Sequence, residues 1–184
     1  IHQFNENKRS IPESFIQQAR ILTWWIEAFP LNSQQNELAV NHAKEALEHT
    51  IDNLPIQRFD PWVIQAHLYL ANADRIYASD PELADRLCHS LIDSMIGFVK
   101  AFPDDLTLNT LLGNLDQIGS RFHPDNPEKI SEHYRFARDQ YEKVLIVDPE
   151  HVMALGGYGI LVTDFQDPEK GLDLLTRATR LRPR

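Results

Sequence analysis

His42, Glu45 and His49 come closest, by residue type and spacing, to a metal-binding site. They fall in a stretch with helical periodicity, and His42 and His49 share one helix face because they are seven residues apart. At a rise of 1.5 Å per residue, the two histidines are about 10.5 Å apart along the axis, too far to bind one ion at about 2.1 Å. We therefore interpret this group as a solvated helix face and predict no metal site.

Cys88 and His89 place a nucleophile next to a base in the sequence. Adjacent residues of a helix point about 100° apart, so their side chains do not face each other. Cys88 also falls on an apolar stripe with Ala84 and Leu91, where a thiol behaves as a small hydrophobic side chain. The sequence predicts a core cysteine rather than a catalytic one. Because it is the only cysteine, the chain forms no internal disulfide.

Asp104, Asp105, Asp164 and Asp167 are acidic residues whose type suits acid–base catalysis or calcium binding. They lie at predicted helix boundaries, where Asp usually serves as a cap or turn residue. The spacing of an EF-hand calcium loop is absent, as are the G-x-S-x-G, H-E-x-x-H, C-x-x-C and phosphate-loop motifs. We expect no catalytic residue and no cofactor, and therefore expect that the chain is not an enzyme.

The composition is typical of a soluble globular protein, with 42% hydrophobic and 24% charged residues among 184. The net charge of −9 argues against a nucleic-acid partner, because phosphate binding requires clustered Lys and Arg. No apolar run approaches the ~20 residues that span a bilayer, so no direct membrane insertion is expected. Cytoplasmic and periplasmic locations are both compatible with the sequence. Since the first residue is Ile, we expect the chain to be part of a longer protein.

Proline placement indicates helices along the whole chain. A capping side chain precedes proline at Asp60-Pro61, Asp80-Pro81, Asn126-Pro127, Asp148-Pro149 and Asp167-Pro168. An oxygen that accepts from free amides, followed by a residue without an N–H, suits the start of a helix. No sustained alternation indicates a strand. We expect an all-α protein of about eight helices, at 12–29, 33–54, 61–77, 81–102, 105–120 and 127–147, with two more in 149–184.

The last third of the chain repeats itself with a period of 34 residues. The recurring positions pair Ala137 with Gly171, Tyr141 with Leu175, Val144 with Ala178, and Pro149 with Pro183. Between the two sets lies Leu155-x2-Tyr158-Gly159-x2-Val162. Together these residues resemble the tetratricopeptide repeat, a unit of two helices. The resemblance implies a right-handed solenoid of antiparallel helix pairs, in which each unit packs on the next.

The resemblance covers residues 137–183 well and residues 61–183 loosely. It divides a single helical domain, 1–184, into an irregular N-terminal helix pair at 1–58 and units at 59–103, 104–148 and 149–184. Ala66, Gly113 and Gly159 mark the middle of the first helix of these units, where we expect the second helix to cross closely. Their spacings of 47 and 46 residues exceed the regular 34, so the middle units are longer than usual.

In proteins that the resemblance points to, the first helices line a concave groove that binds peptides or partner helices. The corresponding residues here are Val63, His67, Leu70, Thr110, Asn114, Gln117, Gly156, Ile160 and Thr163. The set lacks the Lys and Arg cluster with which such modules bind a C-terminal carboxylate, and only Asn114 has a suitable type. We expect a non-catalytic scaffold that binds a protein or peptide partner, with self-association left open.

Two patches lie outside this predicted groove. Trp24 and Trp25 are consecutive and cannot share one narrow helix stripe, so we expect at least one of them at an interface. The C-terminal helix dipole favours a basic end, and docking to an acidic neighbour is the alternative role for the arginines there. These arginines are Arg177, Arg180, Arg182 and Arg184.

Two other functions stay open from the sequence. One is an accessory domain of an enzyme or of a membrane-bound or cell-envelope assembly, which flanking catalytic or membrane-spanning sequence would favour. The other is a small-molecule sensor with its ligand inside the superhelix, which ligand-dependent thermal stabilisation would favour.

Overall fold

The computed structural model describes residues 41–42, 60–165 and 167–181. These residues are all-α, as predicted. They hold six helices rather than eight: α3 (Asp60–Ser79), α4 (Pro81–Ala101), α5 (Leu106–Ser120), α6 (Pro127–Val147), α7 (Val152–Phe165) and α8 (Pro168–Leu181). The helices predicted at 12–29 and 33–54 lie outside the described residues, except for residues 41–42, which are helical. Trp24, Trp25, Arg182 and Arg184 also lie outside them.

The chain divides into two units, Ile1–Asn72 and Ala73–Arg184. The described part of the first unit consists of residues 41–42 and the beginning of α3, along which Ile64, Ala66, Leu68 and Tyr69 are buried. The second unit contains the end of α3 and all of α4 to α8. It holds a core cluster built from α6, α7 and α8.

Capping side chains begin α4, α5 and α6 where the sequence predicted them. The backbone N–H of Leu83 donates to Asp80 Oδ1 over 2.9 Å at the start of α4. The N–H of Leu108 donates to Asp105 Oδ1 over 2.9 Å at the start of α5, and Asn126 caps α6 in the same way. Each cap satisfies an amide that has no partner inside its helix, so the bounds of α4, α5 and α6 match the prediction within one residue.

The Asp148-Pro149 pair does not begin a helix, contrary to the prediction. Asp148 follows the last residue of α6, and its Oδ1 accepts from the N–H of Glu150 over 3.1 Å. The N–H of His151 bonds to the carbonyl of Asp148, which closes a turn. α7 begins only after this turn, where Nδ1 of His151 accepts from the N–H of Ala154 over 3.3 Å. Asp148 therefore stabilises the turn between α6 and α7, and His151 caps α7.

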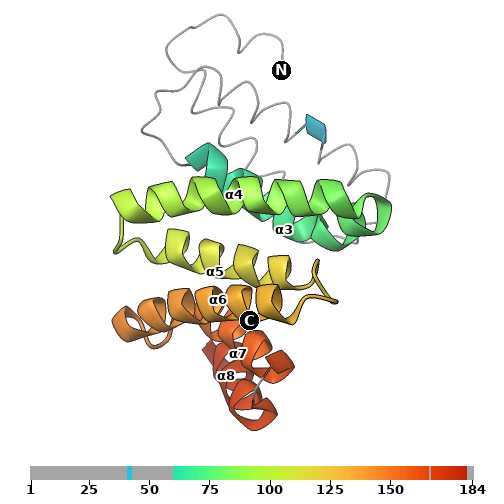
Figure 1. Cartoon of the computed structure of the whole chain (residues 1–184). Coiled ribbons are helices and arrows are strands. Elements are labelled where there is room, and N and C mark those ends of the chain that lie inside the picture. The colour runs from blue at the N-terminus through green and yellow to red at the C-terminus, as the bar shows by residue number, and fades with distance from the viewer. Residues whose placement is uncertain (1–40, 43–59, 166, 182–184) are drawn as a thin grey trace, which may run out of the picture. The chain divides into compact units, whose positions relative to one another are not determined.

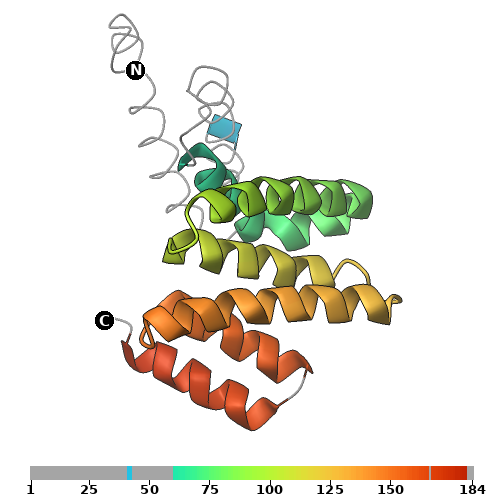
Figure 2. The ribbon, with the colours of Figure 1, turned by 60° about the vertical axis from the view of Figure 1, so that its left-hand side comes forward.

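Consecutive helices pack on one another from α4 to α8, and α5 also contacts α7. Figure 1 shows α4, α5 and α6 side by side along their length, with α7 and α8 below them and seen nearly end-on. The turned view of Figure 2 shows α7 and α8 lengthwise as a helical hairpin packed beneath α6. The last pair therefore crosses the helices before it, and the first helix of one pair meets the first helix of the next.

Tyr141 of α6 lies at the centre of the C-terminal core, with none of its surface exposed. Two glycines make room for its ring. A Cβ on Gly113 of α5 would lie 2.9 Å from Cε1 of the ring, and a Cβ on Gly157 of α7 would lie 2.6 Å from Cζ. The ring therefore joins three helices at a point where two of them have no side chain.

Gly159 and Gly171 bring α7 and α8 into close contact. A Cβ on Gly171 would lie 2.8 Å from the carbonyl oxygen of Gly159 and would collide with Oγ1 of Thr163. A Cβ on Gly159 would lie 2.8 Å from Cγ of Leu175. The expected close crossing at Gly159 is confirmed, and the partner glycine on α8 explains why the backbones can approach so closely.

Candidate functional site

The predicted groove residues on α3 and the first one on α5 have little exposed surface. Val63, His67 and Leu70 are half-buried on α3, in the first unit of the chain. Thr110 is buried, and its hydroxyl donates to the carbonyl of Leu106 over 2.7 Å, within α5. The Thr110 hydroxyl is therefore already satisfied by its own helix.

Asn114 and Gln117, the other two predicted groove residues on α5, bind the hydroxyl of Tyr141. The hydroxyl donates to Oδ1 of Asn114 over 2.7 Å. Because a hydroxyl has only one proton, Gln117 meets it through its amide nitrogen, which donates to the hydroxyl oxygen over 2.9 Å. Burial raises the pKa of Tyr141 well above its usual range, and the Asp116 carboxylate acts in the same direction. The polar side chains of Asn114 and Gln117 therefore form hydrogen bonds to a residue of the core.

Ile160 and Thr163 on α7 are exposed, unlike the predicted residues on α5. Ile160 is 42% exposed and shares a helix face with Met153, which is 50% exposed, and with the intervening Gly156. No heavy atom lies within 4 Å of a Cβ built on Gly156, so this face is open at its middle. The hydroxyl of Thr163 donates to the carbonyl of Gly159 over 2.8 Å. We call Met153, Gly156 and Ile160 the α7 stripe.

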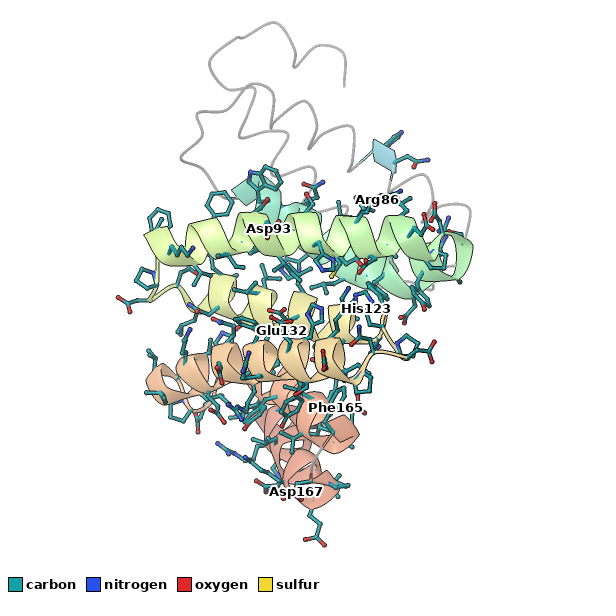
Figure 3. The ribbon with its side chains drawn as sticks, in the orientation of Figure 1. Arg86, Asp93, His123, Glu132, Phe165 and Asp167 are labelled. Carbon is teal, nitrogen blue, oxygen red and sulfur yellow. The ribbon has the colours of Figure 1, made fainter. Side chains whose placement is uncertain are left out.

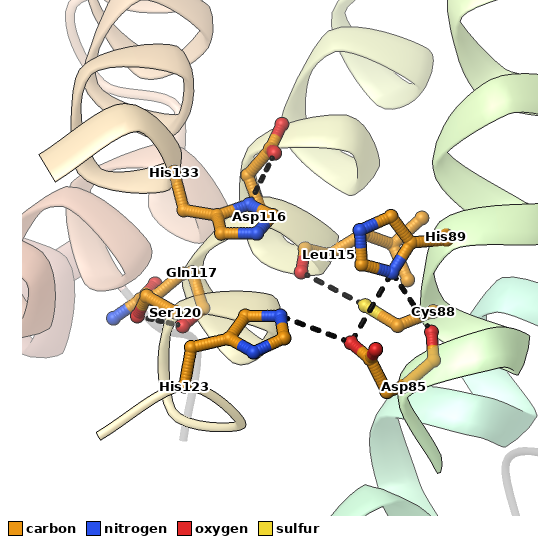
Figure 4. Close-up of polar contacts among 9 residues, drawn as sticks. All are labelled: Asp85, Cys88, His89, Leu115, Asp116, Gln117, Ser120, His123 and His133. Carbon is orange, nitrogen blue, oxygen red and sulfur yellow. Dashed lines mark hydrogen bonds and ion pairs between the residues drawn. The ribbon is translucent and has the colours of Figure 1, made fainter. Parts of the chain in front are cut away.

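Three histidines from different elements meet in the second unit. His89 lies on α4, His123 in the connection between α5 and α6, and His133 on α6. One ring nitrogen from each lies within 4.8 Å of the other two. The ring centroids are 6.0–6.2 Å apart. Figure 3 shows His123 between α4 and α6 at the end of α5, and Figure 4 shows the three rings drawn together. We call these residues the three-histidine cluster.

Neighbouring apolar contacts hold the cluster in place. Phe122, directly before His123, is buried and stacks on Tyr77 of α3 with a centroid distance of 4.9 Å. Cys88, directly before His89, has none of its surface exposed, and its Sγ donates to the carbonyl of Leu115 over 3.4 Å. The predicted core role of Cys88 is confirmed, and its burial turns His89 toward the edge of the α4–α5 contact.

Two carboxylates lie beside the cluster. His133 donates from Nδ1 to Oδ1 of Asp116 over 3.0 Å. His89 donates from Nδ1 to the backbone carbonyl of Asp85 over 3.0 Å, and the same nitrogen lies 3.2 Å from Oδ1 of Asp85. Nε2 of His123 lies 3.1 Å from that Oδ1 as well. Figure 4 shows Asp85 between the His89 and His123 rings.

The Asp85–His123 contact is close but poorly directed. Oδ1 of Asp85 and Nε2 of His123 are both buried, and neither makes a hydrogen bond of acceptable angle. Burial lowers the pKa of His123, and the Asp85 carboxylate opposes this effect. Burial likewise raises the pKa of Asp116, against the hydrogen bond and charge of His133. The site therefore favours the neutral form of the His123 ring, which is the form that binds metals.

Sequence reasoning considered His89 only as a neighbour of Cys88, and it missed the other two histidines of the cluster. The three are separated by 34 and 10 residues, a spacing that no local metal motif has. The positions of Asp85, four residues before His89, and of Asp116 become meaningful only when α4, α5 and α6 pack together. The group first considered cannot be compared with it, since Glu45 and His49 lie outside the described residues.

Comparisons with protein-family models, with characterised proteins and with solved structures find no match to this chain. None of the helices in the described ranges is both long enough and apolar enough to cross a membrane. The described residues therefore form an all-α structure whose helices pack in sequence as pairs, and they include the α7 stripe and the three-histidine cluster.

Proposed function

We propose that this chain is a non-catalytic protein-interaction module, a tetratricopeptide-like solenoid of helix pairs that binds a peptide or partner helix on α7. The sequential packing of α4 to α8 supports the architecture. One observation carries the binding role, the α7 stripe. It lies on the first helix of its pair, which is the helix that lines the groove in the family this chain resembles.

The shape of the stripe suits an apolar side chain from a partner. Met153 and Ile160 are exposed apolar side chains three residues before and four residues after Gly156, which has no side chain to fill the space between them. A partner side chain seated there would cover both and would contact the backbone at the glycine. Burying a side chain of this size contributes about 1.5–3 kcal/mol, enough to anchor a short peptide.

Charge at the two ends of the stripe indicates the chemistry of the partner. Glu150 and Asp164 are exposed near the beginning and end of α7, and the helix itself carries no basic residue. The chain as a whole has a net charge of −9. The partner that fits is therefore an apolar peptide or helix with Lys or Arg at its ends.

A displayed peptide library, rich in apolar segments flanked by Lys or Arg, provides the test. Binding of selected peptides to the full chain is then measured by fluorescence anisotropy, with Ile160→Glu as the test variant. The matched control is Leu172→Glu, which changes an equally apolar residue, 66% exposed, on α8. We expect Ile160→Glu to weaken binding at least about tenfold and Leu172→Glu to leave it unchanged. Failure to select any peptide, or equal binding by both variants, would refute the proposal.

A further inference from the structure

The ring nitrogens of the three-histidine cluster are only slightly farther apart than the ligands of a bound metal ion. Three atoms no more than 4.8 Å apart have a common centre within about 2.8 Å of each, and zinc–imidazole bonds are about 2.0–2.1 Å long. Each ring nitrogen would therefore move by less than about 1 Å to reach a shared ion, which small side-chain rotations can supply.

The nitrogens that face such an ion follow from the hydrogen bonds. Nδ1 of His133 is protonated toward Asp116, and Nδ1 of His89 is protonated toward the carbonyl of Asp85. In His123 it is Nε2 that lies next to the Asp85 carboxylate. The remaining lone pairs are on Nε2 of His89 and Nε2 of His133, and the buried Nε2 of His123 makes no hydrogen bond.

The carboxylates have the position of the outer partners that usually orient metal-binding histidines. Asp116 contacts His133, and Asp85 contacts His89 and His123, so every ring has a carboxylate oxygen within 3.2 Å of one of its nitrogens. The poorly directed contact between Asp85 and His123 has a simple explanation in this arrangement. Both atoms are buried without a hydrogen bond, and an ion held between the rings would give Nε2 of His123 the partner that it lacks.

We propose that His89, His123 and His133 bind one zinc-class divalent ion, with Asp85 and Asp116 orienting the ligands. Imidazole nitrogen favours Zn²⁺, Ni²⁺ and Cu²⁺ over Mg²⁺ and Ca²⁺, which prefer oxygen ligands. Three protein ligands leave the fourth tetrahedral position to water. His89 is half exposed at the side chain, which gives an ion a route from solvent to the other two rings.

The site would join two consecutive helix pairs. Its ligands come from α4 and from the α5–α6 segment, and no disulfide links these elements. An ion bound to the folded state alone stabilises that state in proportion to its binding. Metal occupancy would therefore fix the packing of α4 against α5 and α6, while the α7 stripe stays outside the site.

The test uses the full chain, stripped of metal with a chelator and titrated with ZnCl₂ by calorimetry. We expect one equivalent to bind with a dissociation constant in the micromolar range or below, and MgCl₂ not to bind. Free zinc at about 100 times its dissociation constant should raise the melting temperature by about 5–10 °C. Co²⁺ should give the intense visible absorption of a tetrahedral site.

His89→Ala is the main variant, because this half-exposed side chain can be removed without opening the core. It should lose the stoichiometric binding and the thermal shift, while its metal-free melting temperature stays close to that of the wild type. His123→Ala/His133→Ala is the second variant, and His42→Ala, which removes an exposed histidine outside the cluster, is the matched control. Wild-type protein that takes up no zinc, or His89→Ala that binds it as tightly as the control does, would overturn the proposal.

Discussion

Replacing Gly171 with alanine tests the close contact between α7 and α8. The added Cβ would lie 2.8 Å from the carbonyl oxygen of Gly159 and 2.9 Å from the backbone nitrogen of Thr163. Both are backbone atoms, so no side chain can rotate away, and ordinary contact begins only at 3.4 Å. The two helices must therefore separate by about 0.5 Å, which is an overpacking change of the kind that costs about 1–3 kcal/mol.

Alanine also favours the helix over glycine by about 1 kcal/mol, which offsets part of this cost. The net effect on the free energy of unfolding should be a loss of up to about 2 kcal/mol, or up to about 8 °C in melting temperature. Gly156→Ala on α7 is the matched control. Its Cβ meets no heavy atom within 4 Å, so only the gain in helix propensity remains, and it should stabilise by about 0.5–1 kcal/mol.

Thermal unfolding followed by circular dichroism measures both variants, and amide hydrogen exchange shows where the change falls. The loss in Gly171→Ala should appear as faster exchange in α7 and α8, with α4 little affected, because opening can be local. A Gly171→Ala protein as stable as Gly156→Ala would show that the α7–α8 backbones are not in contact as described.

Three further effects follow from Tyr141 and Asp105. Tyr141→Phe should destabilise by about 1–3 kcal/mol in urea unfolding, because Asn114 and Gln117 each lose a hydrogen bond to the buried hydroxyl, and an unchanged urea midpoint would contradict this. Since burial raises the pKa of Tyr141 in the folded state, its contribution to stability is complete below the unfolded pKa of about 10 and is lost as the pH rises further. The urea midpoint should therefore fall as the pH rises above about 10 in the wild type, and less steeply in Tyr141→Phe; equal slopes would contradict this reasoning. Asp105→Ala should cost about 1 kcal/mol through loss of the α5 cap, and Asp104→Ala, which removes a carboxylate that caps no helix, should cost less in the same assay.

The sequence alone determined which residues form helices in most of the described chain. The starts of α4, α5 and α6 could be predicted from their N-cap residues, Asp80, Asp105 and Asn126. A capping oxygen and the apolar stripe that follows it both lie within a few residues of the helix start, so the local sequence is enough to locate it. The burial of Cys88 and the close crossing at Gly159 could be predicted for the same reason, since both follow from one helix face. The helix start predicted at Asp148 was wrong because an aspartate side chain stabilises a turn as well as it caps a helix.

Only the tertiary structure decided which polar residues belong to the core and which to a site. Asn114 and Gln117 have the types of a binding surface, yet they bind Tyr141, which lies 27 and 24 residues away in sequence. Likewise His89, His123 and His133 carry no local pattern, and they meet because α4, the α5–α6 connection and α6 pack around one point. Local sequence sets a helix and its faces through short-range hydrogen bonds and periodicity, whereas the meeting of distant side chains depends on how those faces pack.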